Sequence, residues 1–158
     1  MCVATYRRPD MLGNLLQSLL GQEFDEAADY EIVVVDNDAE LSAEPVVREF
    51  CKRHPGVVRY FTQPQKNIAI TRNVAIAEAR GRFLFFIDDD EIAAPRWMQR
   101  LIDCQRTFAA DAVFGRIIPH FPEESPDWVR STFLFNRHCQ ATGTPSRRTC
   151  SGNCMVRA

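Results

Sequence analysis

The sequence predicts an α/β fold, with a mostly parallel, Rossmann-like sheet flanked by helices. Apolar segments without polar alternation recur along the chain, as in strands that are buried on both faces of a parallel sheet. Segments with apolar residues at helical spacing lie between them, and polar or acidic residues follow several of the apolar runs. With 158 residues, of which 46% are hydrophobic and 25% charged, the chain fits one globular domain.

The first expected strand is the short apolar run CVAT, residues 2–5. A polar turn follows, and Pro9 suits the first position of a helix because proline has no backbone N–H to leave unbonded. Leucines recur at helical spacing from Leu12 to Leu20 and give that helix one apolar stripe. The β-branched run YEIVVVDND, residues 30–38, then predicts a buried strand that ends in acidic residues.

The middle of the chain continues the same alternation. Ser42 is expected to cap a helix whose apolar residues within 43–51 again follow the helical period. The run GVVRYFT, residues 56–62, predicts the third strand. The alanine-rich segment NIAITRNVAIAEARG, residues 67–81, predicts a loop that leads into a helix, with Gly81 in the position that usually follows a helix C-terminus.

Two more strands and one helix are expected before residue 119. The apolar run RFLFFID, residues 82–88, predicts the fourth strand, and Pro95 is expected to open a helix that ends near Phe108. The run DAVFGRIIP, residues 111–119, predicts the fifth strand. This completes the strand–helix alternation that is typical of a parallel sheet.

The pattern changes after residue 118, which suggests two regions within one domain. Residues 1–118 are expected to form the ligand-binding α/β region, and residues 119–158 the start of a second, incomplete region. The second region is rich in Pro, Ser and Thr, with one helix expected around Trp128 and a strand near Cys150–Val156. The chain is therefore expected to be part of a longer protein.

Charge and hydropathy exclude several classes of partner. The net charge is −2, from 19 basic and 21 acidic residues in an even mixture, so nucleic acid and anionic membranes are not expected partners. No apolar run approaches the roughly 18 residues that cross a bilayer, so no transmembrane segment is expected.

Polar groups follow three of the expected strands, and their positions predict a binding site. These groups are TYRR after the first strand, DND after the second and DDDE after the fourth. In open parallel sheets, ligands bind beyond the carboxyl ends of the strands. We therefore expect Thr5, Asp36 and Asp88 to gather at one edge of the sheet.

The acidic segment DDDE is the clearest candidate for chemistry. If the strand continues through it, Asp88 and Asp90 point to one face and Asp89 to the other. Two carboxylates on one face repel each other unless a cation neutralises them, and hard oxygen ligands favour Mg²⁺ or Mn²⁺. The alternative is a solvated acidic turn before the next helix, where acidic residues are also favoured.

Two other groups allow both a structural and a functional interpretation. Asp36, Asn37 and Asp38 are residue types common in turns, yet at a strand's carboxyl end they could also bind a nucleoside. Arg72 on the alanine-rich helix is either a solvated arginine or a group that reaches a diphosphate or ribose.

Together, the segments VATYRRPDML, EIVVVDND, NIAITRNVAIAEARG and FLFFIDDDE, with Pro95 and Trp97 after them, resemble the donor-binding half of family 2 inverting glycosyltransferases with the GT-A fold. The resemblance covers about residues 1–118. The IDDDE segment is similar to that of bacterial enzymes that build exopolysaccharides and other surface glycans. The resemblance implies metal-dependent transfer of a sugar from a nucleoside diphosphate donor, of the UDP-sugar type, to a hydroxyl of a glycan or lipid-linked acceptor. It also implies a place in the cytoplasm or at the inner face of the membrane.

The resemblance assigns roles in nucleotide binding to residues on three elements. Thr5 and Tyr6 would line the base pocket, and Asp36 and Asn37 would read the uracil. The pair Arg72–Asn73 would lie close to the nucleotide.

The resemblance also assigns the acidic segment. Asp88 and Asp90 match the first and last acids of the family's DxD motif. Asp90 would be the principal ligand of Mn²⁺ or Mg²⁺, with Asp88 as the second metal residue, while Asp88 and Asp89 would face the ribose and the metal's waters. The pair chosen is the same as the pair that strand alternation selects.

The sequence departs from the family pattern at the expected catalytic base. The family carries this acid in its acceptor-binding half, whereas Glu123, Glu124 and Asp127 are the only acids after Pro119 and lie in a Pro-rich setting. The base is therefore unknown and expected beyond Ala158. Ala4 and Arg7 also replace the family's usual Pro and frequent Asn, and Asn37 replaces a frequent Asp.

Two other functions are compatible with parts of the sequence. In this form the chain could bind a nucleoside diphosphate without transferring a sugar. A phosphotransferase of the haloacid-dehalogenase kind is disfavoured, because that class carries its DxD motif after the first strand and not the fourth.

Overall fold

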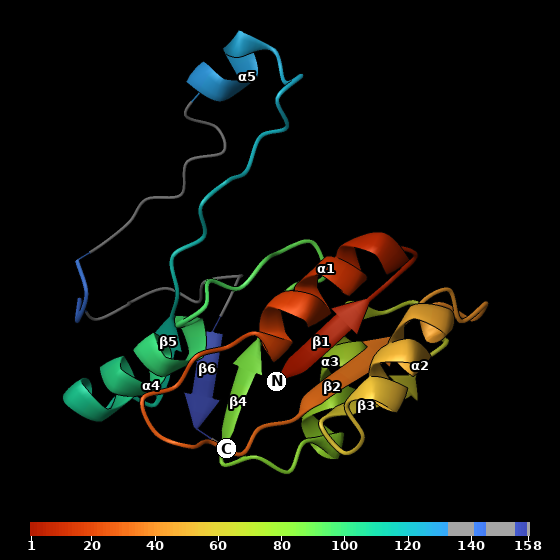
Figure 1. The fold of residues 1–158 in the computed structure, drawn as a ribbon, viewed down its shortest axis with the longest axis horizontal. Helices are drawn as coiled ribbons and strands as arrows, with labels where there is room; N and C mark the ends of the chain where they lie inside the picture. Colours follow the sequence, from red (N-terminus) through yellow and green to blue (C-terminus); the bar gives the residue numbers. More distant parts are fainter. Residues whose placement is uncertain (133–140, 145–153, 158) are drawn as a thin grey trace.

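A mixed sheet with strand order β3-β2-β1-β4-β6-β5 forms the centre of the computed structural model, which describes residues 1–132, 141–144 and 154–157. Its strands are β1 (Cys2–Thr5), β2 (Ile32–Asp36), β3 (Val58–Thr62), β4 (Phe83–Phe86), β5 (Ala112–Phe114) and β6 (Cys154–Arg157). The helices of the described residues are α1 (Pro9–Leu20), α2 (Glu44–Arg53), α3 (Ile68–Glu78), α4 (Trp97–Phe108) and α5 (Asp127–Ser131). The predicted α/β class is confirmed (Figure 1).

The sheet is mostly parallel, as expected. Strand β1 pairs in parallel with β2 and with β4, and β2 pairs in parallel with β3. Strand β6 runs antiparallel to both β4 and β5 and lies between them. The strand expected near Cys150–Val156 is therefore present as β6. Residues 154–157 are thus part of the same sheet as the strands within residues 1–118, and residues 150–153 of the expected strand lie outside the described residues.

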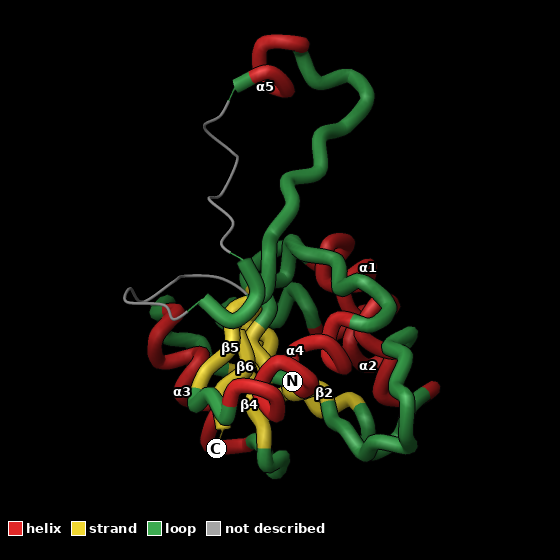
Figure 2. Tube along the Cα trace, turned by 90° about the vertical axis from the view of Figure 1, so that its left-hand side faces the viewer, coloured by secondary structure: helices red, strands yellow, loops and turns green. Residues whose placement is uncertain are grey.

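Helices cover both faces of the sheet, which explains why the strands show no polar alternation. Val34 of β2 belongs to a large core cluster with the leucines of α1, and Val33 and Val35 belong to a second cluster with Ala75 of α3. Figure 2 shows α1, α2 and α4 on one side of the strands and α3 on the other. Successive β2 side chains point to opposite faces, so an apolar run without alternation is what burial on both faces requires.

Helix α2 does not start as expected. Ala43 precedes its first residue, no side chain caps it, and the predicted cap by Ser42 is wrong. The backbone N–H of Ala43 instead donates to the carboxylate of Asp36 at 2.9 Å. A buried acid from the neighbouring strand thus takes the place of a local cap.

The ends of several other elements also differ from expectation, and strand β5 covers only Ala112–Phe114 of the predicted 111–119. Helix α3 stops at Glu78 with an extended residue after it, so Gly81 does not form a left-handed C-terminal cap. Strand β4 stops at Phe86, which leaves the acidic segment outside the strand. Helix α4 starts at Trp97, two residues after Pro95, and ends at Phe108 as predicted.

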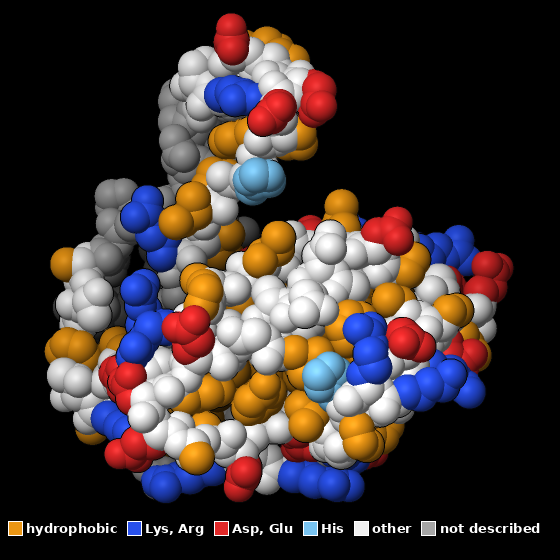
Figure 3. Space-filling view, in the orientation of Figure 1, with side chains coloured by type: hydrophobic (Ala, Val, Ile, Leu, Met, Phe, Trp, Pro, Cys, Tyr) orange, Lys and Arg blue, Asp and Glu red, His pale blue; other side chains and the backbone are white. Residues whose placement is uncertain are grey.

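The segment after β5 leaves the sheet and leads to α5, which confirms the helix expected around Trp128. Figure 1 shows α5 standing away from the strands, and Figure 3 shows the same part as a narrow projection. On the face drawn in Figure 3, basic and acidic side chains are mixed without a large patch of one sign. No helix among the described residues is long and apolar enough to cross a bilayer.

The start of α3 gives a first stability prediction. The Asn67 side chain accepts hydrogen bonds from the backbone N–H groups of Ala69 and Ile70, at 3.0 and 3.2 Å. Replacing Asn67 by alanine is therefore expected to lower the free energy of unfolding by about 1 kcal/mol. Urea denaturation measures this change. Asn73→Ala on the exposed face of the same helix is the matched control, and an equal loss in both variants would contradict the capping role.

Candidate functional site

The carboxyl ends of β1, β2 and β4 meet at one edge of the sheet. The strand register places Thr5 opposite Asp36, and the hydroxyl of Thr5 donates to Oδ2 of Asp89 at 2.8 Å. The chain beyond β4 therefore lies directly against the end of β1. The expected gathering of polar groups at this edge is confirmed.

The turn after β1 separates two neighbouring arginines. Arg7 has a φ of 55°, in the left-handed region that is costly for a residue with a side chain. Its Nε donates to Asp38 at 3.1 Å, on the β2 side of the site. The Arg8 Nη1 instead contacts Asp89 at 3.2 Å and Asp90 at 2.8 Å. The turn thus sends one guanidinium to each of two acidic loops.

The three aspartates after β4 have different surroundings. Asp89 is buried and also accepts, at 3.4 Å, a hydrogen bond from the backbone N–H of Tyr6. Asp88 accepts from Arg72 at 2.7 Å, and the side chains of Asp88 and Asp90 are about half exposed, at 47% and 49%. Two arginines therefore supply the positive charge that offsets these carboxylates.

This arrangement corrects the alternation argument. Alternation of the side chains requires a strand that continues through the acids, but β4 ends at Phe86 and the chain turns at Asp89 and Asp90. Asp89 does not point to a remote face of the sheet. It is the buried member of the group, and it links the β1–α1 turn to the loop after β4.

These side chains line an open cleft of about 320 Å³. Its walls are formed by Ala4, Tyr6, Arg8, Ile68, Arg72, Asp88, Asp89 and Asp90. The Tyr6 ring is flanked by cations, with the Arg7 guanidinium carbon 5.3 Å and the Lys66 ammonium 4.7 Å from its centroid. A cleft that combines arginines, carboxylates and an aromatic ring offers groups to a ligand that carries both charge and a flat ring.

The Asp36 carboxylate accepts hydrogen bonds from groups inside the protein. It is fully buried, its Oδ1 accepts from the backbone N–H of Asp38, and its Oδ2 accepts from the N–H of Ala43 and the hydroxyl of Tyr60, each at 2.9 Å. Burial and the hydrogen bond to Asp36 raise the pKa of Tyr60 well above its usual value, so this hydroxyl stays protonated and remains a donor. Asp36 does not line the cleft, and this geometry favours an anchoring role.

Asn37 is also held by backbone groups. Its Nδ2 donates to the carbonyl oxygens of Gln63 and Gln65, at 2.6 and 2.8 Å, and its Oδ1 accepts from the N–H of Asn67 at 3.1 Å. These bonds fix the loop between β3 and α3. The geometry therefore gives no support to the expected reading of uracil by Asn37, since donor and acceptor groups of the amide are already engaged.

The other expected site residues divide between the cleft and its surroundings. Tyr6 and Arg72 line the cleft, whereas Thr5 is buried beneath it and acts through Asp89. Asn73 is exposed on α3 and does not line it. Sequence reasoning did not single out Arg8, although it marked the TYRR turn in which Arg8 lies.

The acidic group fits a cation that shares its ligands with a substrate. No set of three or more His, Cys, Asp or Glu side chains within the described ranges is arranged to hold a metal on its own. Magnesium sites commonly use one or two carboxylates and take further oxygens from substrate phosphates. Asp88 and Asp90 meet this need, because both carboxylates are half exposed and line the same cleft.

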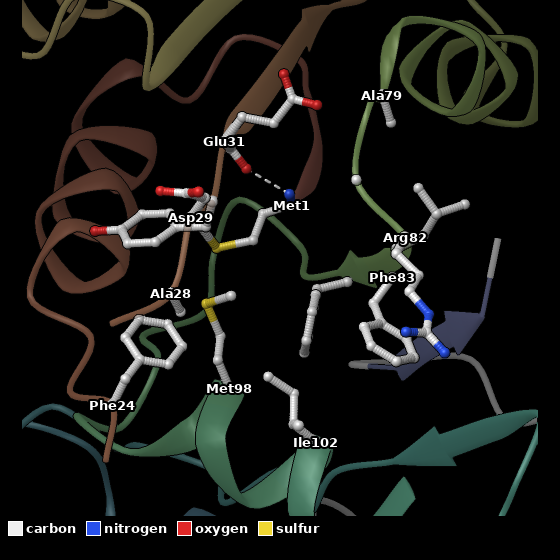
Figure 4. Close-up of a pocket in the computed structure, with 14 residues that line it drawn as sticks. Met1, Phe24, Ala28, Asp29, Glu31, Ala79, Arg82, Phe83, Met98 and Ile102 are labelled. Atoms are coloured by element: carbon white, nitrogen blue, oxygen red, sulfur yellow. Dashed lines mark hydrogen bonds between the residues drawn. The ribbon is translucent and has the colours of Figure 1, made fainter. Parts of the chain in front are cut away.

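A second cavity, of about 160 Å³, lies at the opposite, amino ends of the strands (Figure 4). Met1 precedes β1 and Arg82 precedes β4, and Phe24 and Ile102 complete an apolar wall. In Figure 4 the side chains of Met1 and Met98 point toward one another. This lining offers little to a diphosphate, so the cleft at the carboxyl ends is the better candidate site.

Comparison with known proteins identifies the family. Residues 1–158 match the glycosyl transferase family 2 profile, and the chain belongs to that family. It is 40% identical over 129 residues to the succinoglycan biosynthesis protein ExoM of Rhizobium meliloti, covering 82% of this chain and 41% of ExoM. It is 24% identical over 115 residues to the poly(ribitol-phosphate) β-N-acetylglucosaminyltransferase TarP of Staphylococcus aureus, covering 71% of this chain and 34% of TarP.

The fold agrees with this family. The crystal structure of S. aureus TarS residues 1–349 in complex with UDP superposes with a TM-score of 0.60 and 25% identity, over 75% of this chain and 37% of that one. The chain thus has the GT-A glycosyltransferase fold and spans less than half the length of each of these relatives.

Proposed function

We propose that the chain binds the donor in a metal-dependent glycosyltransferase, which moves a sugar from a UDP-sugar to a hydroxyl of a glycan or lipid-linked acceptor. The observation that carries this proposal is the cleft at the carboxyl edge, where Arg8 and Arg72 lie beside three aspartates. The name of ExoM supports a role in polysaccharide biosynthesis, and the TarS complex supports UDP as the nucleotide.

The cleft offers suitable groups to each part of such a donor. Arg8 and Arg72 are about half exposed, at 51% and 40%, so their guanidinium groups can reach a diphosphate through paired hydrogen bonds. The ring of Tyr6 offers a flat surface for a base. The bond between Thr5 and Asp89 holds the turn after β1, which carries Tyr6 and Arg8, against the loop after β4.

Asp90, with Asp88, is the proposed holder of Mn²⁺ or Mg²⁺. When bound, the ion supplies Lewis-acid neutralisation of the charge that develops on the departing diphosphate. The half-exposed carboxylates contribute oxygen ligands and negative charge to that site. Asp89 contributes through position, because its buried carboxylate ties the loop that presents Asp90 to the end of β1.

UDP binding tests this proposal. In a calorimetric titration, Mn²⁺ is expected to strengthen UDP binding to the chain by about tenfold or more, and Asp90→Ala is expected to remove most of that gain. Asp111→Ala, at an exposed position outside the cleft, is the matched control. UDP binding that is the same with and without Mn²⁺ would contradict the metal-dependent part, and no UDP binding at all would contradict the donor site.

The position of the downstream acids favours a second candidate, a module that binds the donor without transferring sugar by itself. Glu123, Glu124 and Asp127 are exposed at or near α5 and do not line the cleft. We propose that the acid that activates the acceptor lies beyond Ala158. A positioned base is worth about 10² to 10⁴ in rate.

Release of UDP from a panel of UDP-sugars distinguishes the two candidates. The 158-residue chain is expected to release UDP slowly and at a rate that added acceptor does not change. Full acceptor-dependent turnover by this chain would contradict the expectation and direct mutagenesis to Glu124 and Asp127.

A further inference from the structure

Arg8 holds the carboxylate that the proposed cation needs. A single nitrogen, Nη1, contacts Oδ1 of Asp89 at 3.2 Å and Oδ2 of Asp90 at 2.8 Å. A divalent cation on Asp90 would lie next to a guanidinium of the same sign, which is unfavourable at such short range. The two cations therefore compete for one carboxylate.

The two contacts of Arg8 differ in how easily they are lost. Asp90 is half exposed, and an ion pair in such a place is weak because water screens it. Asp89 is buried and keeps Thr5 and the N–H of Tyr6 as further partners. The Arg8 side chain can therefore leave Asp90 while the loop remains anchored through Asp89.

On the basis of the proposed function, we propose that Arg8 is the counter-cation of Asp90 when no nucleotide is bound. The divalent cation then replaces Arg8 at this carboxylate during donor binding. Without nucleotide, the guanidinium neutralises Asp90 and opposes binding of a divalent cation. With UDP present, the displaced guanidinium, which lines the same cleft, contacts the diphosphate. Arg8 is thus a donor-binding residue that lowers affinity for the free metal and raises affinity for the metal–nucleotide pair.

The neighbouring arginine provides a matched control. Arg7 is as exposed as Arg8, at 53% against 51%, and also pairs with a carboxylate, that of Asp38. It forms no hydrogen bond or ion pair with Asp88, Asp89 or Asp90 and does not line the cleft. Arg7→Gln removes the same charge one residue away, so it reports the general effect of net charge on metal binding.

Electron paramagnetic resonance of free Mn²⁺ during a titration measures the first half of the exchange. Without nucleotide, Arg8→Gln is expected to bind Mn²⁺ about 3-fold to 10-fold more tightly than the unmodified chain, and Arg7→Gln less than about 2-fold more tightly. In the presence of Mn²⁺, Arg8→Gln is expected to bind UDP about 3-fold to 10-fold more weakly.

The outcomes separate this inference from the proposed function. If the unmodified chain shows Mn²⁺-dependent UDP binding but Arg8→Gln binds free Mn²⁺ no more tightly than Arg7→Gln, the exchange is overturned and the proposed function stands. If no variant binds Mn²⁺ with or without UDP, the metal-dependent function fails and the exchange fails with it.

A measurement on the Arg8 side chain itself does not depend on whether an Arg8 variant folds. In ¹⁵N NMR spectra, the Nε–H signal of Arg8 is expected to shift on addition of Mg²⁺ in the unmodified chain and to stay unchanged in Asp90→Asn. A Mg²⁺-induced shift of equal size in both would overturn the proposal.

Discussion

Replacing Asp89 by alanine is expected to weaken UDP binding by about tenfold or more, both with and without Mn²⁺, and to lower the free energy of unfolding by about 2–3 kcal/mol. The buried carboxylate accepts from the hydroxyl of Thr5, the N–H of Tyr6 and the guanidinium of Arg8. Its loss leaves the buried Thr5 hydroxyl and the partly buried N–H of Tyr6 without this acceptor, and it removes the contact that joins the loops after β1 and β4. Calorimetry with UDP and urea denaturation measure the two effects.

Asp90→Ala is the comparison for this prediction. Asp90 is half exposed and pairs with Arg8, so its removal is expected to change unfolding free energy by about 0.5 kcal/mol or less while abolishing the Mn²⁺ effect. The two variants are thus expected to differ in kind, since Asp89→Ala lowers stability and UDP affinity in general and Asp90→Ala removes the Mn²⁺ effect. Equal unfolding free energies for the two variants would contradict the anchoring role of Asp89.

Asp36→Ala is expected to lower the free energy of unfolding by about 3 kcal/mol, the largest stability effect predicted for this chain. Three donors, the buried N–H groups of Asp38 and Ala43 and the partly buried hydroxyl of Tyr60, would lose their acceptor. Urea denaturation measures the loss.

Two further variants make the Asp36 prediction specific. Tyr60→Phe removes one of the three bonds and is expected to cost about 1 kcal/mol, and Asp111→Ala at an exposed site less than about 0.5 kcal/mol. If Asp36→Ala costs less than Tyr60→Phe, Asp36 is not the anchor of this loop. A stable Asp36→Ala variant that had lost only UDP binding would instead restore the base-reading role.

The arrangement of the site could be predicted from the sequence because it follows from strand order and direction. Apolar runs such as IVVVD indicated strands that are buried on both faces, and parallel strands bring their carboxyl ends to one edge. Thr5, Asp36 and the acidic segment are therefore predicted to lie together from the sequence alone. The antiparallel setting of β6 between β4 and β5 could not be read in the same way, because pairing between distant strands leaves no local pattern.

The individual roles within the site were less predictable, because they depend on side-chain partners from other elements. Asp36 and Asn37 looked like free polar groups at a strand end, but they bond to Tyr60 and to the loop between β3 and α3. The roles of Asp88, Asp89 and Asp90 depend on whether strand β4 continues through these residues or ends before them. The residue at which such a strand ends is decided by the contacts of the loop that follows it, here the hydrogen bond between Thr5 and Asp89.

Chemical-shift mapping with UDP and Mg²⁺ tests whether the nucleotide and a divalent cation bind in the cleft at the carboxyl ends of the strands. The cavity at the opposite ends of the strands, shown in Figure 4, is an internal control in the same molecule. We expect the largest shifts at the backbone amides of Tyr6, Arg8 and Asp88 to Asp90, and none at Met98 or Ile102. Shifts that centre on Met98 and Ile102 and leave Asp88 to Asp90 unchanged would contradict the claim.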